Sequence, residues 1–355
     1  MEILCLIDTL DSGGAQRQLA ILAKLLSDSG HDVTVLSYHR GDFYLPYLQE
    51  NGVKVVILSE PSKLWRYLRV LAKLIFSRRD IIIAYLQGPS KFAEISSFFN
   101  RAKIISSERS YGGNPESRGE RFRYWLHGRA DVLVTNSEAQ LQWIQHHYPH
   151  LKGESVSIFN CVDLEHFSPD KWSRKDGPSK IAGVGRVDKG KSPLLLLEAV
   201  YQLRDPSLIH VDWYGRVGEP KYAAKLKSRI LELGASDSFI LHGPTDSIRD
   251  VYRASDFICQ PTRLEGCSNV VCEAIACGKI VITTPAGDNE RLVENGVNGF
   301  IFPIGDLEAL VVNLSKAIGL SSSQRQSMEK ASRNKAVGLL SQQTFLESYE
   351  SLIVK

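Results

Sequence analysis

The chain alternates between short apolar runs and amphipathic segments, and this alternation constrains the fold more than any other feature of the 355 residues. Apolar runs such as EILCLID at 2–8 and DIIIAYLQ at 80–87 are separated by segments whose apolar residues recur with helical spacing. Strict alternation of strand and helix is typical of parallel sheets that carry helices on both faces. The sequence therefore predicts an α/β protein with doubly wound sheets.

A polar segment at residues 168–180, SPDKWSRKDGPSK, interrupts the pattern, and the alternation then starts afresh. We expect two tandem doubly wound Rossmann-like domains facing a central cleft, because ligands of such sheets bind beyond the carboxyl ends of the strands. The predicted parts are an N-terminal domain at 1–167, a linker at 168–180, a C-terminal domain at 181–322, and a helical segment at 323–355 that packs back on the N-terminal domain.

The composition excludes several classes of protein. Hydrophobic residues make up 43% and charged residues 23%, which is typical of a globular protein, and the net charge of +3 is too small to indicate nucleic-acid binding. The six cysteines form no CxxC pair and no cluster with zinc spacing, so we expect reduced thiols in a cytoplasmic protein. No apolar run reaches the roughly 18 residues of a membrane span, and the N-terminus lacks the basic region of a signal peptide.

Two glutamates mark the stretch EGCSNVVCEAIACG at 265–278, which lies between the apolar runs DFICQP and KIVITTP. The pattern predicts a strand, a loop with Glu265, a helix with Glu273 in its first turns, and a second strand. Helix N-termini in such units bind phosphate. Carboxylates beside a phosphate would repel it, so their presence is favourable only if they bind neutral hydroxyl groups of the same ligand. The stretch thus indicates a ligand with phosphates and sugar hydroxyls, or else an ordinary crossover with surface glutamates.

A basic cluster follows the first strand of the second predicted domain, in GVGRVDKGKSP at 183–193. A dinucleotide-binding strand–turn would carry a third glycine where Asp188 stands. The cations Arg186, Lys189 and Lys191 favour a bound diphosphate over a nicotinamide cofactor. The alternative is a solvated turn with a few cations.

Taken together, these two motifs resemble the second domain of the large retaining glycosyltransferase family with the GT-B fold and the E-x7-E motif, the glycosyl transferases group 1. Further matches cover nearly the whole chain: GGAQ at 13–16, ADVLVTNSE at 130–138, IFNCVDLEHFSP at 158–169 and NGVNGFIF at 295–302. The resemblance implies an acceptor-binding N-terminal domain and a C-terminal domain that binds a nucleotide-sugar.

The resemblance also assigns roles to residues. Arg186 and Lys191 are expected to act on the diphosphate, with Lys189 as the alternative lysine, while Glu265 approaches the transferred sugar and Glu273 holds the ribose. The expected donor-binding residues are Gly13, Gly14, Gly185, Pro244, Ser268, Asn269, Val270 and Glu273. The expected acceptor residues are Gln16, Glu108, Arg109 and Asn160. Glu108 and Arg109 stand where the family often has a histidine, and a structural ion pair is the alternative for each.

No Asp-x-Asp pair occurs in the sequence, so we expect transfer without a metal and without a cofactor. Two fixed cations and a helix N-terminus can offset the charge that develops on a leaving diphosphate. Retention of anomeric configuration is implied by the resemblance alone. Two glutamates could also form a glycosidase pair, but the ribose role of Glu273 argues against it.

The segment KLWRYLRVLAKLIFSRR at 63–79 is predicted to be a helix with leucines 64, 68 and 71 and Ile75 on one face. Residues 61–130 contain 14 basic and 5 acidic residues. The helix either covers the first sheet or lies on an anionic membrane surface. Arginines at 118, 121, 123 and 129 favour an acceptor that carries phosphate, such as a lipid diphosphate.

The predicted function is a retaining, metal-independent hexosyl- or N-acetylhexosaminyltransferase. It moves a sugar from a nucleotide-sugar, with UDP as the expected nucleotide, to a lipid-linked or saccharide acceptor in cell-surface polysaccharide biosynthesis, including lipopolysaccharide. Two alternatives stay open: a nucleotide-sugar epimerase or phosphorylase on the same fold, and a non-catalytic nucleotide-sugar-binding subunit. We expect a cytoplasmic protein, either free or peripheral on the inner face of the plasma membrane.

Overall fold

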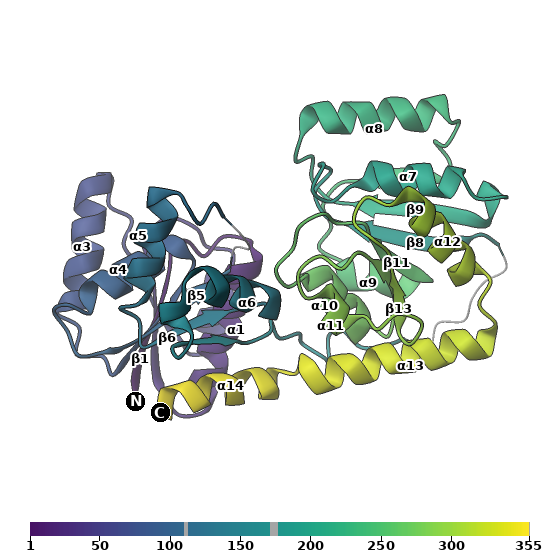
Figure 1. Ribbon diagram of the computed structural model, residues 1–355. Coiled ribbons are helices and arrows are strands. Elements are labelled where there is room, and N and C mark those ends of the chain that lie inside the picture. Colours follow the sequence, from purple (N-terminus) through teal and green to yellow (C-terminus); the bar gives the residue numbers. More distant parts are fainter. Residues whose placement is uncertain (110–112, 171–176, 355) are drawn as a thin grey trace. The chain divides into compact units, whose positions relative to one another are not determined.

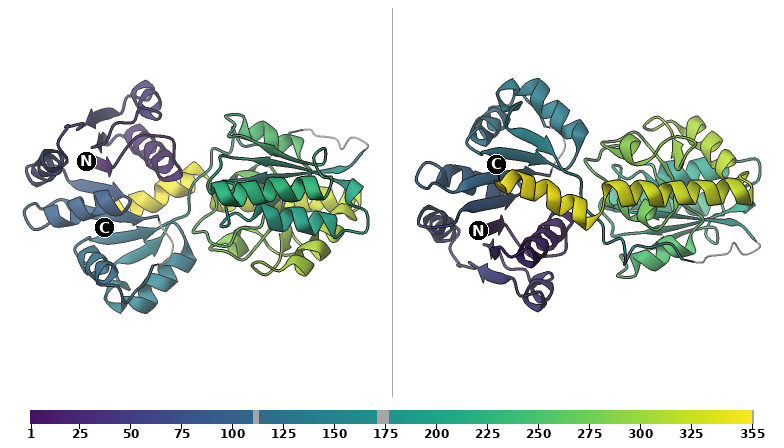
Figure 2. Two further views of the ribbon diagram at one scale, coloured as in Figure 1. Left: turned by 90° about the horizontal axis from the view of Figure 1, so that it is seen from above. Right: turned by 90° about the horizontal axis from the view of Figure 1, so that it is seen from below.

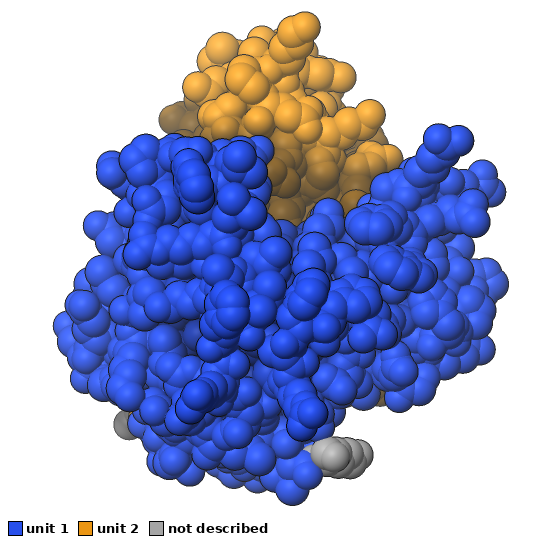
Figure 3. Space-filling view, turned by 90° about the vertical axis from the view of Figure 1, so that its left-hand side faces the viewer, with its two compact units in different colours: residues 1–161, 342–355 blue, residues 162–341 orange. Residues whose placement is uncertain are grey.

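The computed structural model describes residues 1–109, 113–170 and 177–354. The chain divides into two compact units, which Figure 3 shows in different colours. One unit comprises Met1–Cys161 together with Gln342–Lys355, and the other comprises Val162–Ser341. Each unit contains one parallel sheet with helices on both faces (Figure 1).

In the first unit, the described residues form a seven-stranded parallel sheet in the order β3-β2-β1-β4-β5-β6-β7. Its strands are β1 (Glu2–Ile7), β2 (Asp32–Ser37), β3 (Lys54–Ile57), β4 (Ile81–Tyr85), β5 (Lys103–Glu108), β6 (Val132–Thr135) and β7 (Ser155–Ser157). Its helices are α1 (Gly14–Asp28), α2 (Leu45–Glu50), α3 (Lys63–Ile75), α4 (Gln87–Ser96), α5 (Arg118–His127), α6 (Glu138–His147) and α14 (Gln342–Val354), with a 3-10 turn at Pro149–Leu151.

Buried apolar side chains lie on both faces of this sheet. On one face, Leu19 and Leu22 of α1 and Tyr349 of α14 pack against the strands, and α14 lies beside α1 (Figure 2). On the other face, Val70 and Leu74 of α3 pack with α4, and α4 also contacts α5 (Figure 1). The near-continuous apolar strands therefore reflect burial from both sides, as parallel sheets require.

In the second unit, the described residues form a six-stranded parallel sheet in the order β10-β9-β8-β11-β12-β13. Its strands are β8 (Ser179–Val184), β9 (Ile209–Tyr214), β10 (Phe239–His242), β11 (Phe257–Gln260), β12 (Ile280–Thr283) and β13 (Gly299–Ile301). Its helices are α7 (Pro193–Tyr201), α8 (Pro220–Glu232), α9 (Ile248–Ala254), α10 (Asn269–Ala276), α11 (Asn289–Leu292), α12 (Leu307–Ile318) and α13 (Ser322–Leu339), with a 3-10 turn at Pro206–Leu208.

The strands of the two sheets are arranged in the same way. In each sheet the chain first adds two strands on one side of its first strand, and then adds the remaining strands on the other side. The reversal lies between β1 and β4 in the first unit and between β8 and β11 in the second. Ligands of doubly wound folds bind at this point, beyond the carboxyl ends of the strands. The loops after β1, β8 and β11 carry Gly13, Arg186 and Glu265, respectively. The topology thus places these predicted residues at the binding edge of their own sheets.

The predicted fold class, two tandem Rossmann-like α/β domains, is confirmed, and every strand expected from an apolar run is present. The division between the units lies six residues before the predicted boundary at 167. Residues 162–167 join the second unit because Arg333 of α13 donates hydrogen bonds to the carbonyls of Phe167 and Leu164, at 2.8 and 2.9 Å.

The predicted linker at 168–180 and helical segment at 323–355 are each divided in the structure. Residues 171–176 lie outside the described residues, and β8 begins at Ser179, inside the predicted linker. The C-terminal segment forms two helices, of which α13 belongs to the second unit and α14 to the first. A buried hydrogen bond of 2.7 Å between the hydroxyls of Tyr85 and Tyr349 holds α14 in the first unit.

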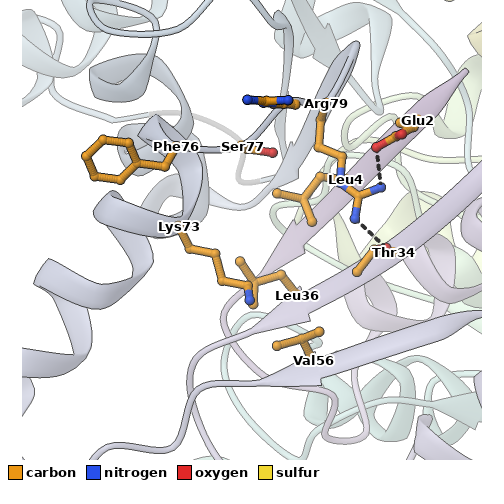
Figure 4. Close-up of a pocket in the computed structure, with 10 residues that line it drawn as sticks. Glu2, Leu4, Thr34, Leu36, Val56, Lys73, Phe76, Ser77 and Arg79 are labelled. Atoms are coloured by element: carbon orange, nitrogen blue, oxygen red, sulfur yellow. Dashed lines mark hydrogen bonds and ion pairs between the residues drawn. The ribbon is translucent and has the colours of Figure 1, made fainter.

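Helix α3 is shorter than predicted: it ends at Ile75, whereas the predicted helix ran to residue 79. Beyond it, Arg79 turns back to the sheet and donates to Glu2 at 3.0 Å and to Thr34 at 3.2 Å (Figure 4). These residues line a pocket of about 330 Å³ between the end of α3 and strands β1, β2 and β3. The pocket lies against the face of the sheet that α3 covers and extends to Glu2, the first residue of β1.

The face that α3 presents to the sheet also differs from the prediction. The buried side chains are Val70 and Leu74, whereas Leu64 and Leu68 of the predicted apolar face are exposed. In the described part of the chain, no helix combines the length and apolar character needed to cross a membrane.

Candidate functional site

Close backbone packing shapes the turn after β8. Gly185 and Gly215 have φ angles of 148° and 151°, a region that favours glycine. A Cβ on Gly215 would lie 2.1 Å from the carbonyl oxygen of Gly185, so the two turns fit only without a side chain there. The indole Nε1 of Trp213 donates to the same carbonyl at 2.9 Å. This packing fixes the point from which the basic loop leaves the sheet.

Asp188 organises the basic loop, a role that the sequence interpretation missed. Its buried carboxylate accepts a hydrogen bond from the backbone N–H of Lys191 at 2.9 Å, and Arg186 Nε lies 3.1 Å from the other carboxylate oxygen. The Arg186 side chain remains 57% exposed, so it can reach a ligand. The signal for this role was an aspartate three residues before the lysine, where a side chain can close a turn on the backbone.

Lys191 and Glu265, which are 74 residues apart in sequence, form an ion pair between Lys191 Nζ and Glu265 Oε1. Thr262 lies on the same side, with its hydroxyl 3.4 Å from that oxygen. Both charged side chains are mostly shielded from solvent, which strengthens their attraction relative to a surface pair. The structure therefore brings together two of the three predicted catalytic residues.

The second glutamate lies on α10, whose first turn follows the loop of Glu265. Ser268 caps this helix and accepts from the N–H of Val271 at 3.5 Å, which leaves Asn269 and Val270 at the first two helical positions. Helix N-termini are positive and favour bound anions. Glu273 is buried and accepts a hydrogen bond from Tyr252 at 2.9 Å. Tyr252 was missed because nothing in the sequence links it to Glu273.

The turn after β12 braces the Glu265 loop. Gly287 has a φ of 60°, and a Cβ there would lie 2.1 Å from the carbonyl oxygen of Gly266. The N–H of Asp288 donates to that oxygen at 3.0 Å. The segment PAG at 285–287 therefore makes a close backbone contact that holds the loop of Glu265 in place.

Pro244 lies two residues beyond the end of β10 and is exposed. His242, the last residue of β10, makes two contacts with β9. Its Nε2 lies 2.7 Å from Asp212. Its ring stacks on Tyr214, with ring centroids 4.4 Å apart and 8° between the planes. These contacts fix the direction of the segment that carries Pro244. The donor-binding role of Pro244 itself stays a prediction.

In the first unit, Gly13 and Gly14 lie at the start of α1, after β1. A Cβ on Gly13 would lie 2.2 Å from the side-chain oxygen of Gln16, so the glycine leaves room for that amide. Gln16 Nε2 lies 3.4 Å from Asp8 at the end of β1. The structure thus places three predicted residues together at the binding edge of this sheet.

Arg109 and Asn160 also meet at the binding edge of the first sheet. Arg109 Nη1 donates to Asn160 Oδ1 at 2.6 Å, and Arg109 Nε donates to Ser107 at 2.9 Å. The guanidinium lies 4.1 Å from the centroid of the Tyr85 ring, within the range of a cation–π interaction. Four contacting groups therefore hold this cation, including the hydroxyl of Tyr349 at 3.5 Å.

The structure favours the structural interpretation of Glu108. Its side chain is 1% exposed, and its carboxylate lies 3.3 Å from Arg123 and 3.7 Å from His127. It also accepts a hydrogen bond from the backbone N–H of Arg109 at 3.1 Å. These contacts favour the structural ion pair, the alternative given for Glu108, because the carboxylate is buried and holds the residue that follows it; the acceptor role stays a prediction.

His127 connects Glu108 to a second buried carboxylate. His127 Nδ1 lies 2.6 Å from Glu94, which also accepts from the Ser106 hydroxyl at 2.6 Å. Burial disfavours a charged imidazole, but the charges and hydrogen bonds of Glu94 and Glu108 outweigh it and raise the pKa of His127 to about 9. The imidazole is therefore a cation at neutral pH.

Among the residues that the structure describes, no group of three or more histidine, cysteine, aspartate or glutamate side chains is arranged to hold a metal ion. The candidate residues form two groups, one in each unit. The group in the second unit has Arg186, the Lys191–Glu265 pair and the start of α10. The group in the first unit has Gln16, Arg109 and Asn160.

Comparison with known proteins matches both parts of the chain. The sequence profile described as glycosyl transferases group 1 matches residues 165–335, and the profile described as glycosyltransferase family 4 matches residues 12–166. A relative from Campylobacter jejuni, N-acetylgalactosamine-N,N'-diacetylbacillosaminyl-diphospho-undecaprenol 4-alpha-N-acetylgalactosaminyltransferase, is 23% identical over 351 residues, which cover 93% of this chain and 92% of that enzyme.

Solved structures with the same fold include HepE of Anabaena. Its complex with UDP superimposes with a TM-score of 0.88 at 20% identity and covers 100% of both chains. Its complex with UDP-glucose superimposes with a TM-score of 0.85 at 21% identity, again over 100% of both chains. At this identity, the likeness to solved structures establishes the fold alone.

Proposed function

This chain belongs to the family of glycosyl transferases group 1, and from that premise we propose that it transfers a sugar from a UDP-sugar to a lipid-linked or saccharide acceptor. The enzyme is a glycosyltransferase. We place the reaction in cell-surface polysaccharide biosynthesis, with retention of anomeric configuration. The observation that carries the donor role is the meeting of the Lys191–Glu265 pair with the loop of Arg186 at the carboxyl edge of β8 and β11.

The chemistry needs positive charge beside the diphosphate, because the glycosidic oxygen becomes an anion as its bond to the sugar breaks. Lys191 is prealigned for this task by its contact with Glu265 and by the bond from its backbone to Asp188. Arg186 adds a second cation, and the N–H groups at the start of α10 add a third positive region. Fixed charges of this kind stabilise a transition state without reorganising at the moment of reaction.

The two glutamates would then have separate roles. Glu265 lies at the loop with Lys191, where a donor sugar hydroxyl can replace part of the ion pair. Glu273 has a partner in Tyr252, which orients its carboxylate for the two ribose hydroxyls. The UDP and UDP-glucose complexes of HepE, a protein of the same fold, support a uridine nucleotide as the donor.

A lipid-linked acceptor is supported by the Campylobacter relative, whose name gives a diphospho-undecaprenol acceptor. In this chain, Arg109 is the cation placed at the binding edge of the first sheet, with its guanidinium held by Asn160 and Tyr85. A guanidinium held in one orientation is suited to phosphate oxygens. We propose that Arg109, with Asn160 and Gln16, contacts the acceptor.

The nucleotide is tested by thermal shift. UDP is expected to raise the melting temperature more than GDP or ADP, with a stabilisation of about 2.7 kcal/mol at 100 times its dissociation constant. Glu273→Gln is expected to abolish the shift, because the ribose contact is lost. Glu290→Gln, which changes an exposed glutamate of α11, serves as the matched control and should keep the shift.

The metal requirement is tested in the same preparation, because transfer from the UDP-sugar should proceed equally well in excess EDTA. Equal shifts from the three nucleotides, or activity that disappears with EDTA and returns with a divalent cation, would contradict these parts of the proposal.

A peripheral membrane location is supported by α3. Leu64 and Trp65 are 67% and 68% exposed, and Trp65, Leu68 and Arg69 line a shallow apolar groove with Ala72. Basic residues interleave with these apolar side chains along the helix. Such a helix binds an anionic bilayer through apolar burial and through about 1 kcal/mol for each cation near the surface.

The membrane role predicts that Leu64→Glu weakens binding to phosphatidylglycerol vesicles about tenfold or more, because it removes an apolar contact and adds a repelled charge. Leu231→Glu is the matched control, since Leu231 of α8 is 71% exposed on the other unit. Vesicle cosedimentation measures both. Equal binding by the two variants, or no binding by the wild type, would exclude α3 as the membrane surface.

A further inference from the structure

Two cysteines flank the start of α10, inside the stretch that carries both glutamates. Cys267 directly precedes the capping residue Ser268, and Cys272 lies one turn into the helix. Their sulfur atoms are 3.6 Å apart. Neither cysteine forms a disulfide in the structure, and both are buried, although Cys267 keeps an exposed fraction of 8% and Cys272 keeps none. The pair therefore joins the Glu265 loop to the helix, and Cys267 is the more exposed member.

The position of the pair couples it to the proposed donor site. Cys267 follows Glu265 by two residues, and the intervening Gly266 is braced by the N–H of Asp288 at 3.0 Å. Cys272 directly precedes Glu273. The two sulfurs therefore lie on the two segments, the loop of Glu265 and the first turn of α10, that carry the proposed donor residues.

Three buried thiols elsewhere in the chain are less reactive. Burial raises the pKa of Cys5 to about 12 and the pKa of Cys277 to about 11, and it also raises the pKa of Cys259. The thiolate is the form that reacts with oxidants, so these three groups stay protonated and inert at neutral pH. Oxidation is thereby directed to other cysteines.

We propose that Cys267 and Cys272 are a redox modification site, at which hydrogen peroxide joins the two sulfurs in a disulfide that weakens donor binding. The effect on the donor rests on the function proposed above. In the first step, the Cys267 sulfur takes one peroxide oxygen to become a sulfenic acid, and water is released. In the second step, the Cys272 sulfur attacks the Cys267 sulfur, its proton leaves with the hydroxyl as a second water, and the S–S bond forms. Two thiols are oxidised, and one peroxide is reduced to two waters.

The geometry explains why the disulfide acts on the donor site. Disulfide sulfurs lie about 2.0 Å apart, so closing the present 3.6 Å separation brings the two sulfurs about 1.6 Å closer, through rotation of the cysteine side chains together with movement of the loop and the helix that carry them. The Lys191–Glu265 contact and the capping turn of α10 both lie within two residues of these sulfurs. A displacement near 1 Å in a positioned site can lower activity up to about a hundredfold.

The test treats the full-length protein with hydrogen peroxide and follows two readouts. Peptide mapping should find Cys267 linked to Cys272, and reduction with dithiothreitol should remove the link. UDP titration by calorimetry should show an affinity at least about tenfold lower in the oxidised protein, with full recovery on reduction. Cys267→Ala and Cys272→Ala should each keep their UDP affinity after peroxide treatment, whereas Cys277→Ala should respond like the wild type.

The readouts separate two failures. Absence of the linked peptide in the peroxide-treated wild type would overturn the modification site, whatever the ligand. A linked peptide with unchanged UDP affinity would overturn its effect on the donor site. Failure of the reduced wild type to bind UDP would instead count against the proposed donor, and peptide mapping would still decide whether the site is modified.

Discussion

Replacing Lys191 by methionine is expected to lower the kcat of sugar transfer at least about a hundredfold, because it removes a fixed cation beside the leaving diphosphate. The methionine keeps an unbranched stem. This matters because the Lys191 stem packs against Gly185, with its atoms 3.2 Å from where a Cβ on that glycine would lie. The substitution therefore removes the charge and preserves the packing. Initial rates at varied UDP-sugar concentrations measure kcat and KM separately.

Lys189→Met is the matched control for this prediction, because Lys189 is an exposed lysine of the same loop. It is expected to keep a rate near that of the wild type. Melting temperatures of both variants show whether either has lost its fold, since Lys191→Met leaves Glu265 without its cation. An active Lys191→Met together with an inactive Lys189→Met would assign the phosphate role to Lys189.

The fold was predictable from the sequence because parallel strands buried on both faces leave an apolar signature. Runs such as DIIIAYLQ and KIVITTP have no interpretation as exposed segments, and each forms a strand. The helices were harder to predict. α6 was missed, although Ser137 caps it, because its sequence is polar and carries two histidines. The predicted buried face of α3 was wrong because the apolar arc of this helix is wide, and Val70 and Leu74 at one edge of the arc are buried while Leu64 and Leu68 are exposed.

The site was predictable as a set of residues but not as a set of contacts. Short motifs indicated Lys191 and Glu265, yet their ion pair joins loops 74 residues apart, and local spacing carries no information on such a distance. Glu108 was interpreted as a ligand or an ion-pair member because it stands where the family often has a histidine. Its burial depends on His127 and Arg123, which no motif connects to it.

Those buried charges support the second large prediction, which concerns stability. Glu94 and Glu108 are both buried carboxylates, and His127 and Arg123 are the buried cations that face them from α5. Removing one member of such a group leaves a buried charge uncompensated, at a cost of about 3–5 kcal/mol. His127→Gln is therefore expected to lower the free energy of unfolding by about that amount at pH 7. Urea denaturation measures it, and His146→Gln, at an exposed histidine of α6, is the matched control.

The same contacts predict how stability changes with pH. The folded-state pKa of His127 is raised to about 9, above its ordinary value of 6.5, so the folded protein holds this proton more tightly than the unfolded chain. The contribution is complete below pH 6.5 and is lost as pH rises through 9. A shift of this size corresponds to about 3 kcal/mol. Tyr124 and the partly exposed Glu120 also face the group, and burial raises the pKa of Tyr124 further above its ordinary range, so His127 titrates first.

The wild type is therefore expected to lose stability between pH 7 and pH 10, whereas His127→Gln should show a flatter profile over the same interval. The two profiles should converge at high pH, because the wild-type imidazole is then neutral as well. His146→Gln should follow the wild type throughout. Parallel profiles for the wild type and His127→Gln would show that the imidazole is not a buried cation.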